Sequence, residues 1–127
     1  MSEQVQVLIV DDQPRARQSL KALLATWPLI GAVREATNGE EAIGSVEQAR
    51  PDIVLMDVHM PVMNGLEATR RIKEHWPQVR IIALSIYGDY QADALVAGAD
   101  AFVSKGESPE KLLDTVAAVV NATTLNK

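Results

Sequence analysis

Short apolar runs alternate with longer amphipathic segments along the whole chain. The runs are VLIV (7–10), AVREA (32–36), DIVLM (52–56), RIIAL (80–84) and AFVS (101–104). The first, third and fourth runs are almost continuous in branched aliphatic residues, which is typical of strands covered on both faces. The second run has Arg34 and Glu35 in its middle, so we expect it at or near an edge of the sheet.

The segments between these runs have the spacing of helices. In the first of them, apolar residues recur at i, i+3, i+4 and i+7: Leu20, Leu23, Leu24 and Trp27. Asn38 with Glu41 matches a capping box at the start of another helix, and Gly98 is expected to end the fourth helix in a left-handed conformation. Each tryptophan precedes a proline, which predicts helix ends at Trp27-Pro28 and Trp76-Pro77.

This alternation of strands and helices with short connections predicts an α/β fold, a parallel sheet with helices on both faces. No low-complexity tract or linker interrupts the pattern, so we expect one domain. In a doubly wound sheet, ligands bind beyond the carboxyl ends of the strands, at the point where the strand order reverses. The residues that follow the strands are therefore the first candidates for function.

Five polar side chains stand at the ends of four expected strands. The first strand ends at Asp11 and Asp12, the third at Asp57, the fourth at Ser85 and the fifth at Lys105. Clustered carboxylates suit a hard divalent cation such as Mg²⁺, which takes oxygen ligands, and a lysine supplies a point charge suited to a phosphoryl group. Taken singly, each residue also fits an ordinary turn, cap or solvated side chain, so the hypothesis rests on their occurrence together.

Composition and charge exclude several classes of function. The 127 residues suffice for one ordinary domain, and the lack of cysteine excludes disulfides, cysteine–zinc sites and thiol nucleophiles. A formal charge of −5 argues against unaided binding to nucleic acid. No stretch is long enough to span a membrane, and the amino terminus MSEQVQ is not a signal peptide, so we expect a cytoplasmic protein with no membrane partner.

Four stretches carry a resemblance to a known family: VDD after the first strand, DIVLMDVHMPVMNGLE around the third, ALS ending the fourth and AGADAFVSKG around the fifth. In this order they resemble the receiver domain of two-component response regulators. The resemblance implies a flavodoxin-like (CheY-like) sheet of five parallel strands in the order 2-1-3-4-5, with five helices. It implies a receiver domain over residues 5–121, an N-terminal tail (1–4), and a C-terminal tail or the start of a linker (122–127) to an output domain absent from this chain.

The resemblance also implies a role for each strand-end residue. Asp57 corresponds to the phosphoacceptor, which takes a phosphoryl group from a donor histidine. Asp11 and Asp12, together with Asp57 and the backbone carbonyl of His59, are expected to hold Mg²⁺. Lys105 is expected to pair with the phosphoryl group. The chain would then be a signalling switch, not an enzyme with a separate substrate, and would catalyse only its own phosphotransfer and autodephosphorylation.

Two further residues correspond to the family's switch. Ser85 matches the hydroxyl that moves towards the new phosphoryl group, and Phe102 matches the aromatic residue that packs inward on activation. Two positions depart from the common pattern, since Gly106 stands where proline often follows the lysine and Ile86 stands where alanine often follows the hydroxyl. Ile86 is expected to restrict access to the site and to change the rates of phosphorylation or hydrolysis.

The partner that the resemblance implies is a sensor histidine kinase, with a phosphorylation-dependent homodimer as a further expectation. KGESPEKL and LSIYGD resemble the branch that carries a C-terminal LuxR-type helix-turn-helix domain. Control of transcription would then act through that domain, and any contact with DNA would be made by it, because this chain does not contain it.

Two other functions are open at this stage. One is a pseudo-receiver, a protein-interaction module with the fold but without phosphotransfer, and Ile86 keeps it in consideration. The other is a Mg²⁺-dependent phosphohydrolase of haloacid-dehalogenase type, which also uses an aspartate at a strand end. That family needs a second acid two residues after the nucleophile, where this chain has His59, and it needs a cap domain.

Overall fold

Strands and helices alternate in the structure as the hydrophobic pattern predicts. The computed structural model describes residues 4–125. In chain order the elements are β1 (Val5–Val10), α1 (Pro14–Leu24), β2 (Ile30–Ala36), α2 (Gly39–Gln48), β3 (Ile53–Asp57), α3 (Gly65–His75), β4 (Arg80–Ser85), the 3-10 turn η1 (Gly88–Tyr90), α4 (Gln91–Ala97), β5 (Ala101–Ser104) and α5 (Pro109–Leu125).

All five strands are parallel and lie in the order β2-β1-β3-β4-β5. This confirms the flavodoxin-like, doubly wound fold. The order reverses between β1 and β3, so the ends of these two strands flank the point where ligands bind in such sheets. β2 lies at an edge, as its charged residues predict, and its Glu35 accepts hydrogen bonds from Arg17 and Lys21 of α1.

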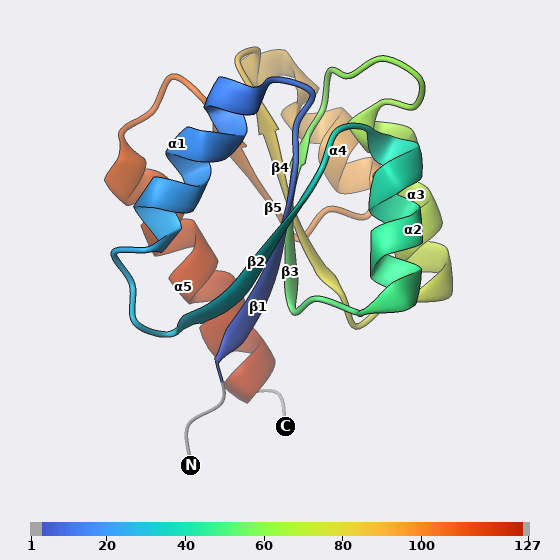
Figure 1. Cartoon of the computed structure of the whole chain (residues 1–127). Helices are drawn as coiled ribbons and strands as arrows, with labels where there is room; N and C mark the ends of the chain where they lie inside the picture. The colour runs from blue at the N-terminus through green and yellow to red at the C-terminus, as the bar shows by residue number, and fades with distance from the viewer. Residues whose placement is uncertain (1–3, 126–127) are drawn as a thin grey trace.

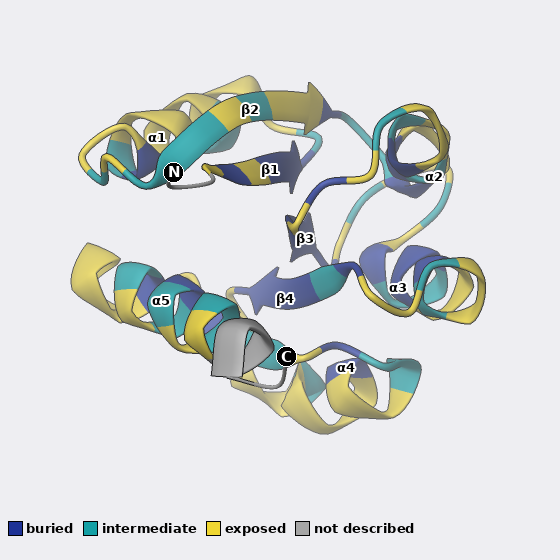
Figure 2. Ribbon diagram, turned by 90° about the horizontal axis from the view of Figure 1, so that it is seen from below, coloured by how far each residue is buried: buried dark blue, intermediate teal, exposed yellow. Residues whose placement is uncertain are grey.

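Two helical layers cover the sheet, α1 and α5 on one face and α2, α3 and α4 on the other (Figure 1). Side chains alternate along each strand, so neighbouring residues enter opposite layers. Ile9 and Leu55 pack in the cluster that faces α1 and α5, whereas Leu8 and Val54 pack in the cluster that faces α2 and α3. Figure 2 shows β1, β3 and β4 largely buried between these layers, which explains their unbroken aliphatic runs.

The helix ends follow the expected signals with one exception. The amide of Glu41 donates to Asn38 Oδ1 at 2.9 Å, so Asn38 caps α2, and Gly98 ends α4 with a φ of 111°. α3 ends at His75 with Trp76 at the C-cap. The prediction for Trp27-Pro28 is wrong, because α1 ends earlier, at Leu24. A turn in which the Trp27 amide donates to the Leu24 carbonyl separates that helix from the proline.

The N-terminal tail expected over residues 1–4 and the C-terminal tail expected over residues 122–127 lie partly outside the described part of the chain. Helix α5 continues to Leu125, so the segment expected to be a tail from residue 122 begins within this helix. Residues 1–3 and 126–127 lie outside the part of the chain that the structure describes. Within residues 4–125, every helix is too short or too polar to span a lipid bilayer.

Candidate functional site

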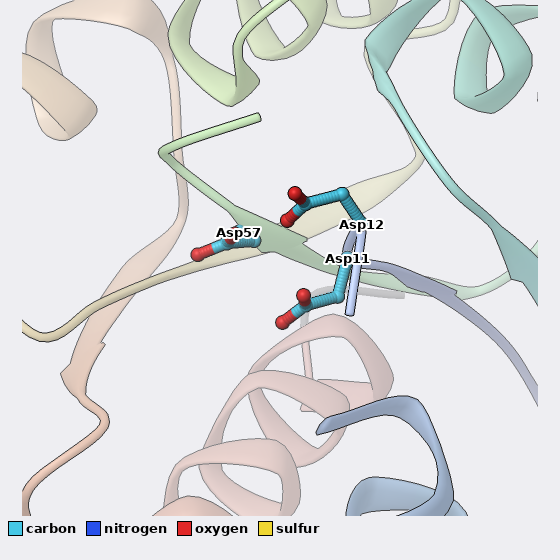
Figure 3. Close-up of side chains that lie close together, drawn as sticks. All are labelled: Asp11, Asp12 and Asp57. Atoms are coloured by element: carbon cyan, nitrogen blue, oxygen red, sulfur yellow. The ribbon is translucent and has the colours of Figure 1, made fainter. Parts of the chain in front are cut away.

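Three carboxylates meet at the carboxyl ends of two neighbouring strands. Asp11 and Asp12 follow β1, and Asp57 ends β3. One ligand oxygen of each lies within 4.8 Å of those of the other two, and Figure 3 shows all three side chains projecting to the same side of the strand ends. Asp11 and Asp57 continue the alternation of Ile9 and Leu55, which explains why both side chains leave the sheet on one face.

Lys105 brings a positive charge to two of these carboxylates. Its Nζ lies 2.7 Å from Asp11 Oδ2 and 3.1 Å from Asp57 Oδ1. The side chains of Asp11 and Asp57 are only 1% and 8% exposed, whereas that of Lys105 is 26% exposed. The backbone holds the lysine in register, because its amide donates to the Ser85 carbonyl at 2.8 Å and so extends the pairing of β5 with β4.

The pKa values of Asp57 and Lys105 are both raised, but for different reasons. Burial raises the pKa of Asp57, and the charges of Asp11 and Asp12 raise it further, against the opposing effect of Lys105. Burial lowers the pKa of Lys105, but the hydrogen bond to Asp11 and the charges of Asp57 and Asp11 outweigh it, so the net shift is upward. The site therefore holds a firmly protonated lysine beside a carboxylate whose negative charge is only partly compensated.

Local hydrogen bonds hold Asp11 in place. Its Oδ1 accepts from the Gln13 amide at 2.9 Å, and its backbone carbonyl accepts from Arg17 Nη1 at 2.7 Å. Arg17 lies on α1, so the end of β1 is tied to the helix that follows it. Lys105 Nζ donates to Oδ2, so both carboxylate oxygens of Asp11 have a hydrogen-bond partner. These partners explain how a buried acid is tolerated next to Asp12.

Gly65 allows the loop after β3 to fold back against the site. A Cβ at this position would lie 2.0 Å from the backbone oxygen of Asp57, closer than any real contact. The Gly65 amide donates to the Val58 carbonyl at 2.9 Å, which fixes the start of α3 beside the strand end. The glycine of MPVMNG is thus needed for close approach to the backbone of Asp57, a requirement that the local sequence pattern does not reveal.

The two switch candidates lie on neighbouring strands. Ser85 ends β4 and is fully buried, and its Oγ accepts a hydrogen bond from the Tyr87 amide at 3.0 Å. Phe102 of β5 is partly buried and packs with Ala83 and Ala94 between the sheet and α4. Their roles in switching stay predictions, as do the roles of Asp57 and Lys105 and the metal ligation by the His59 carbonyl.

The chemistry of the three carboxylates fits a hard cation. All three offer oxygen donors at the same end of the sheet, which is the donor type that Mg²⁺ prefers. Carboxylates this close repel one another, and Lys105 is in contact with two of them but not with Asp12. Asp11, Asp12 and Asp57 are therefore the residues that could hold a divalent cation.

Three aromatic rings lie beside the carboxylates. The ring of His59, two residues after Asp57, lies against the rings of Tyr87 and Tyr90. Nothing in the local sequence pattern links these two tyrosines to His59. The two loops that carry these rings meet only because β3 and β4 are neighbours in the sheet.

Comparisons with known proteins agree with this geometry. The family model described as "Response regulator receiver domain" matches residues 7–117. The chain is 36% identical over 126 residues to the transcriptional regulatory protein DegU of Brevibacillus brevis, covering 94% of this chain and 53% of that protein. It is 38% identical over 114 residues to the nitrate/nitrite response regulator protein NarL of Escherichia coli (strain K12), covering 87% of this chain and 52% of that protein.

Solved structures show the same similarity. A LuxR-family two-component response regulator from Aurantimonas sp. SI85-9A1 superposes with a TM-score of 0.89 at 30% identity, covering 94% of this chain and 87% of that one. The chemotaxis response regulator CheY4 of Vibrio cholerae gives 0.82 at 29% identity, covering 91% and 98%. The chain spans about half the length of the two curated relatives. By its fold, its strand-end residues and these similarities, the chain belongs to the family of response regulator receiver domains.

Proposed function

We propose that Asp57 accepts a phosphoryl group from a sensor histidine kinase and that this modification switches an output surface of the domain. The observation that carries the proposal is the contact of Lys105 with both Asp11 and Asp57 beside a third carboxylate, Asp12. A cation placed against an aspartate at the end of a central strand can neutralise charge that develops on a transferring group.

The transfer itself requires little of the protein beyond positioning. An oxygen of Asp57 attacks the phosphorus of a phosphohistidine, the phosphorus–nitrogen bond breaks, and the imidazole leaves with its electron pair and takes up a proton. Lys105 pairs with an oxygen of the phosphoryl group, and Asp11 keeps the lysine oriented through their 2.7 Å contact. Mg²⁺, when bound by Asp11, Asp12, Asp57 and the His59 carbonyl, supplies positive charge to the phosphoryl oxygens.

Phosphorylation then acts on Ser85 and Phe102. The Ser85 hydroxyl moves to the phosphoryl oxygens. The ring of Phe102, which packs in the cluster with Ala83 and Ala94, then moves into the space that the hydroxyl leaves. A change at these residues alters the surface formed by α4, β5 and α5, which biases a two-state equilibrium between inactive and active forms.

The output of this switch is the control of transcription. The relatives at 36% and 38% identity bear the names of a transcriptional regulatory protein and a nitrate/nitrite response regulator, and about half of each lies outside the similar region. We infer that an output domain binds DNA on behalf of this receiver. A cytoplasmic location and a phosphorylation-dependent homodimer stay predictions.

The proposal is tested by the intact mass of the protein after incubation with acetyl phosphate and Mg²⁺. We expect the wild type to gain one phosphoryl group, and we expect EDTA to prevent the gain. The Asp57→Asn variant keeps the size of the side chain but lacks the nucleophilic carboxylate, so it should gain nothing.

Two results would contradict the proposal. A wild type that gains no phosphoryl group and binds no Mg²⁺ in calorimetry would leave the pseudo-receiver as the better explanation. Equal phosphorylation of the wild type and of Asp57→Asn would place the reaction at another residue.

A further inference from the structure

Asp12 differs from the other two carboxylates of the site in having no side-chain partner. Asp11 and Asp57 both contact Lys105, whereas the carboxylate of Asp12 makes no hydrogen bond or ion pair within residues 4–125. An oxygen of Asp12 nevertheless lies within 4.8 Å of oxygens of the other two. The direction of this side chain is therefore set by its backbone, which means by the peptide units on either side of it.

Both of these peptide units are held by hydrogen bonds. Arg17 Nη1 donates to the Asp11 carbonyl at 2.7 Å, which fixes the peptide between Asp11 and Asp12. The Gln13 amide donates to Asp11 Oδ1 at 2.9 Å, which fixes the peptide between Asp12 and Gln13. Because β1 ends at Val10, a side chain of α1 holds the Asp11 carbonyl in place of a neighbouring strand.

Arg17 is itself fixed by an acid of another strand. Its Nε donates to Glu35 Oε1 of β2 at 2.9 Å, and Glu35 Oε2 accepts from Lys21 Nζ at 3.1 Å. The hydrogen bonds from Lys21 and Arg17 lower the pKa of Glu35, so this acid is ionised at neutral pH. The Arg17 side chain is 15% exposed, and its rigid, planar guanidinium binds the carbonyl and the carboxylate at the same time.

We propose that Arg17 is a positioning residue for the cation site, that Glu35 keeps Arg17 in place, and that both act through the backbone on Asp12. Neither Arg17 nor Glu35 is a ligand of the cation. Partners that orient the ligands of a metal typically contribute about ten- to a hundredfold to its affinity. This inference rests on the proposed function, in which Asp12 binds Mg²⁺.

A purely electrostatic role of Arg17 has the opposite sign. A guanidinium repels a nearby cation, so its removal would tighten the binding of Mg²⁺, and salt would screen this effect. Positioning predicts weaker binding when Arg17 is removed, by a factor that changes little with salt, because the direction of the Asp12 side chain does not depend on ionic strength. The sign of the change in affinity therefore separates the two roles.

The experiment measures the dissociation constant of Mg²⁺ by isothermal titration calorimetry, on the full chain and without a phosphodonor. Arg17→Met removes both hydrogen bonds and should weaken binding by about tenfold. Arg17→Lys keeps the charge but lacks the fork that bridges the carbonyl and Glu35, so it should also weaken binding. Arg15→Met is the matched control, because Arg15 is exposed on the same helix and has no side-chain partner within residues 4–125. This control should bind Mg²⁺ as the wild type does or slightly more tightly.

A double-mutant cycle tests the part played by Glu35. Glu35→Ala should weaken binding on its own and should have no further effect in Arg17→Met, because it acts only through that arginine. The nitrogen chemical shift of the Asp12 amide, measured by NMR without Mg²⁺, should change in Arg17→Met, because this amide shares a peptide unit with the Asp11 carbonyl. The same shift should stay unchanged in Arg15→Met. Circular dichroism shows whether each variant is folded at the temperature of the titration, and Arg17→Lys and Glu35→Ala carry the test if Arg17→Met does not fold.

The outcomes are distinguishable from those of the proposed function. If the wild type binds no Mg²⁺, the proposed metal site and the positioning role both fall. If the wild type binds Mg²⁺ and Arg17→Met binds it as tightly or more tightly, the positioning role alone is overturned. It is also overturned if Arg15→Met weakens binding as much as Arg17→Met does. Weaker binding in Arg17→Met and Arg17→Lys, with Arg15→Met unchanged, supports the positioning role even if Asp57 gains no phosphoryl group.

Discussion

At the scale of single residues, the site depends on one lysine that contacts two carboxylates. Lys105 contacts Asp11 and Asp57, while Asp11 is also held by the Gln13 amide and through its carbonyl by Arg17. Asp11 is therefore satisfied, whereas the charge of Asp57 is only partly compensated and Asp12 does not contact Lys105. Burial makes the anion of Asp57 less stable, which favours a ligand that shares its charge.

The raised pKa of Asp57 predicts how stability depends on pH. Burial and the neighbouring acids raise this pKa above its ordinary value of 3.8, so the folded protein holds this proton more tightly than the unfolded chain. The stability that Asp57 contributes is present below pH 3.8 and is lost as pH rises through the folded pKa. With EDTA present at neutral pH, Asp57→Asn should raise the free energy of unfolding by about 1 kcal/mol.

Denaturant titrations of both proteins over a range of pH check this prediction. The difference should shrink as pH falls through the raised folded pKa towards 3.8, and below 3.8 it should change no further, because the wild-type carboxyl is then protonated in both states. Glu47→Gln, which removes an exposed acid from α2, controls for the change in net charge. A variant less stable than the wild type at neutral pH would show that the contact with Lys105 outweighs burial.

At the scale of elements, local signals determine most boundaries. Aliphatic runs mark β1, β3 and β4, and the ends of these strands differ from the ends of the predicted runs by at most two residues. The end of α1 is different. The stripe of leucines continues in helical spacing to Trp27, but the chain leaves the helix at Leu24, because the tryptophan packs against the core from a turn and not from the helix.

The cap of α2 gives a prediction at this scale. Asn38 Oδ1 accepts from the Glu41 amide, and Glu41 Oε1 accepts from the Thr37 amide at 3.0 Å, so two amides at the helix start depend on this pair. Asn38→Ala should lower the free energy of unfolding by about 1 kcal/mol. Asn38→Asp keeps the accepting oxygen and should stay close to the wild type. Urea unfolding followed by circular dichroism measures both, and equal losses in the two variants would contradict the capping argument.

At the scale of the whole molecule, the sheet order assembles the site from distant segments. Asp11 and Lys105 are 94 residues apart along the chain, yet their side chains are in hydrogen-bond contact. β3 lies beside β1, and β4 connects it to β5, so the carboxyl ends of all the strands that carry candidate residues meet at one edge. The unfolded chain has no such site, and any ligand of the three carboxylates therefore stabilises the fold.

This linkage predicts a dependence of thermal stability on Mg²⁺. The unfolding midpoint should rise with Mg²⁺ concentration, and stability should gain about 1.4 kcal/mol for each tenfold increase above the dissociation constant. EDTA should reverse the rise. Asp12→Asn removes a carboxylate that does not contact Lys105, so it should abolish the rise and leave the folded structure intact. A Mg²⁺ effect of the same size in Asp12→Asn would place the cation elsewhere.

The sequence alone determined which segments are strands and helices, and which polar residues follow the strands. These features depend on local periodicity, capping and turn chemistry, and the resemblance to receiver domains supplied the strand order. Tertiary structure decided what no local pattern encodes: Lys105 lies between Asp11 and Asp57, Gly65 is needed against the Asp57 backbone, and the rings of His59 and Tyr87 meet. Each of these depends on strands that are neighbours in space but far apart in the chain, and their distances and burial are set only when the sheet forms.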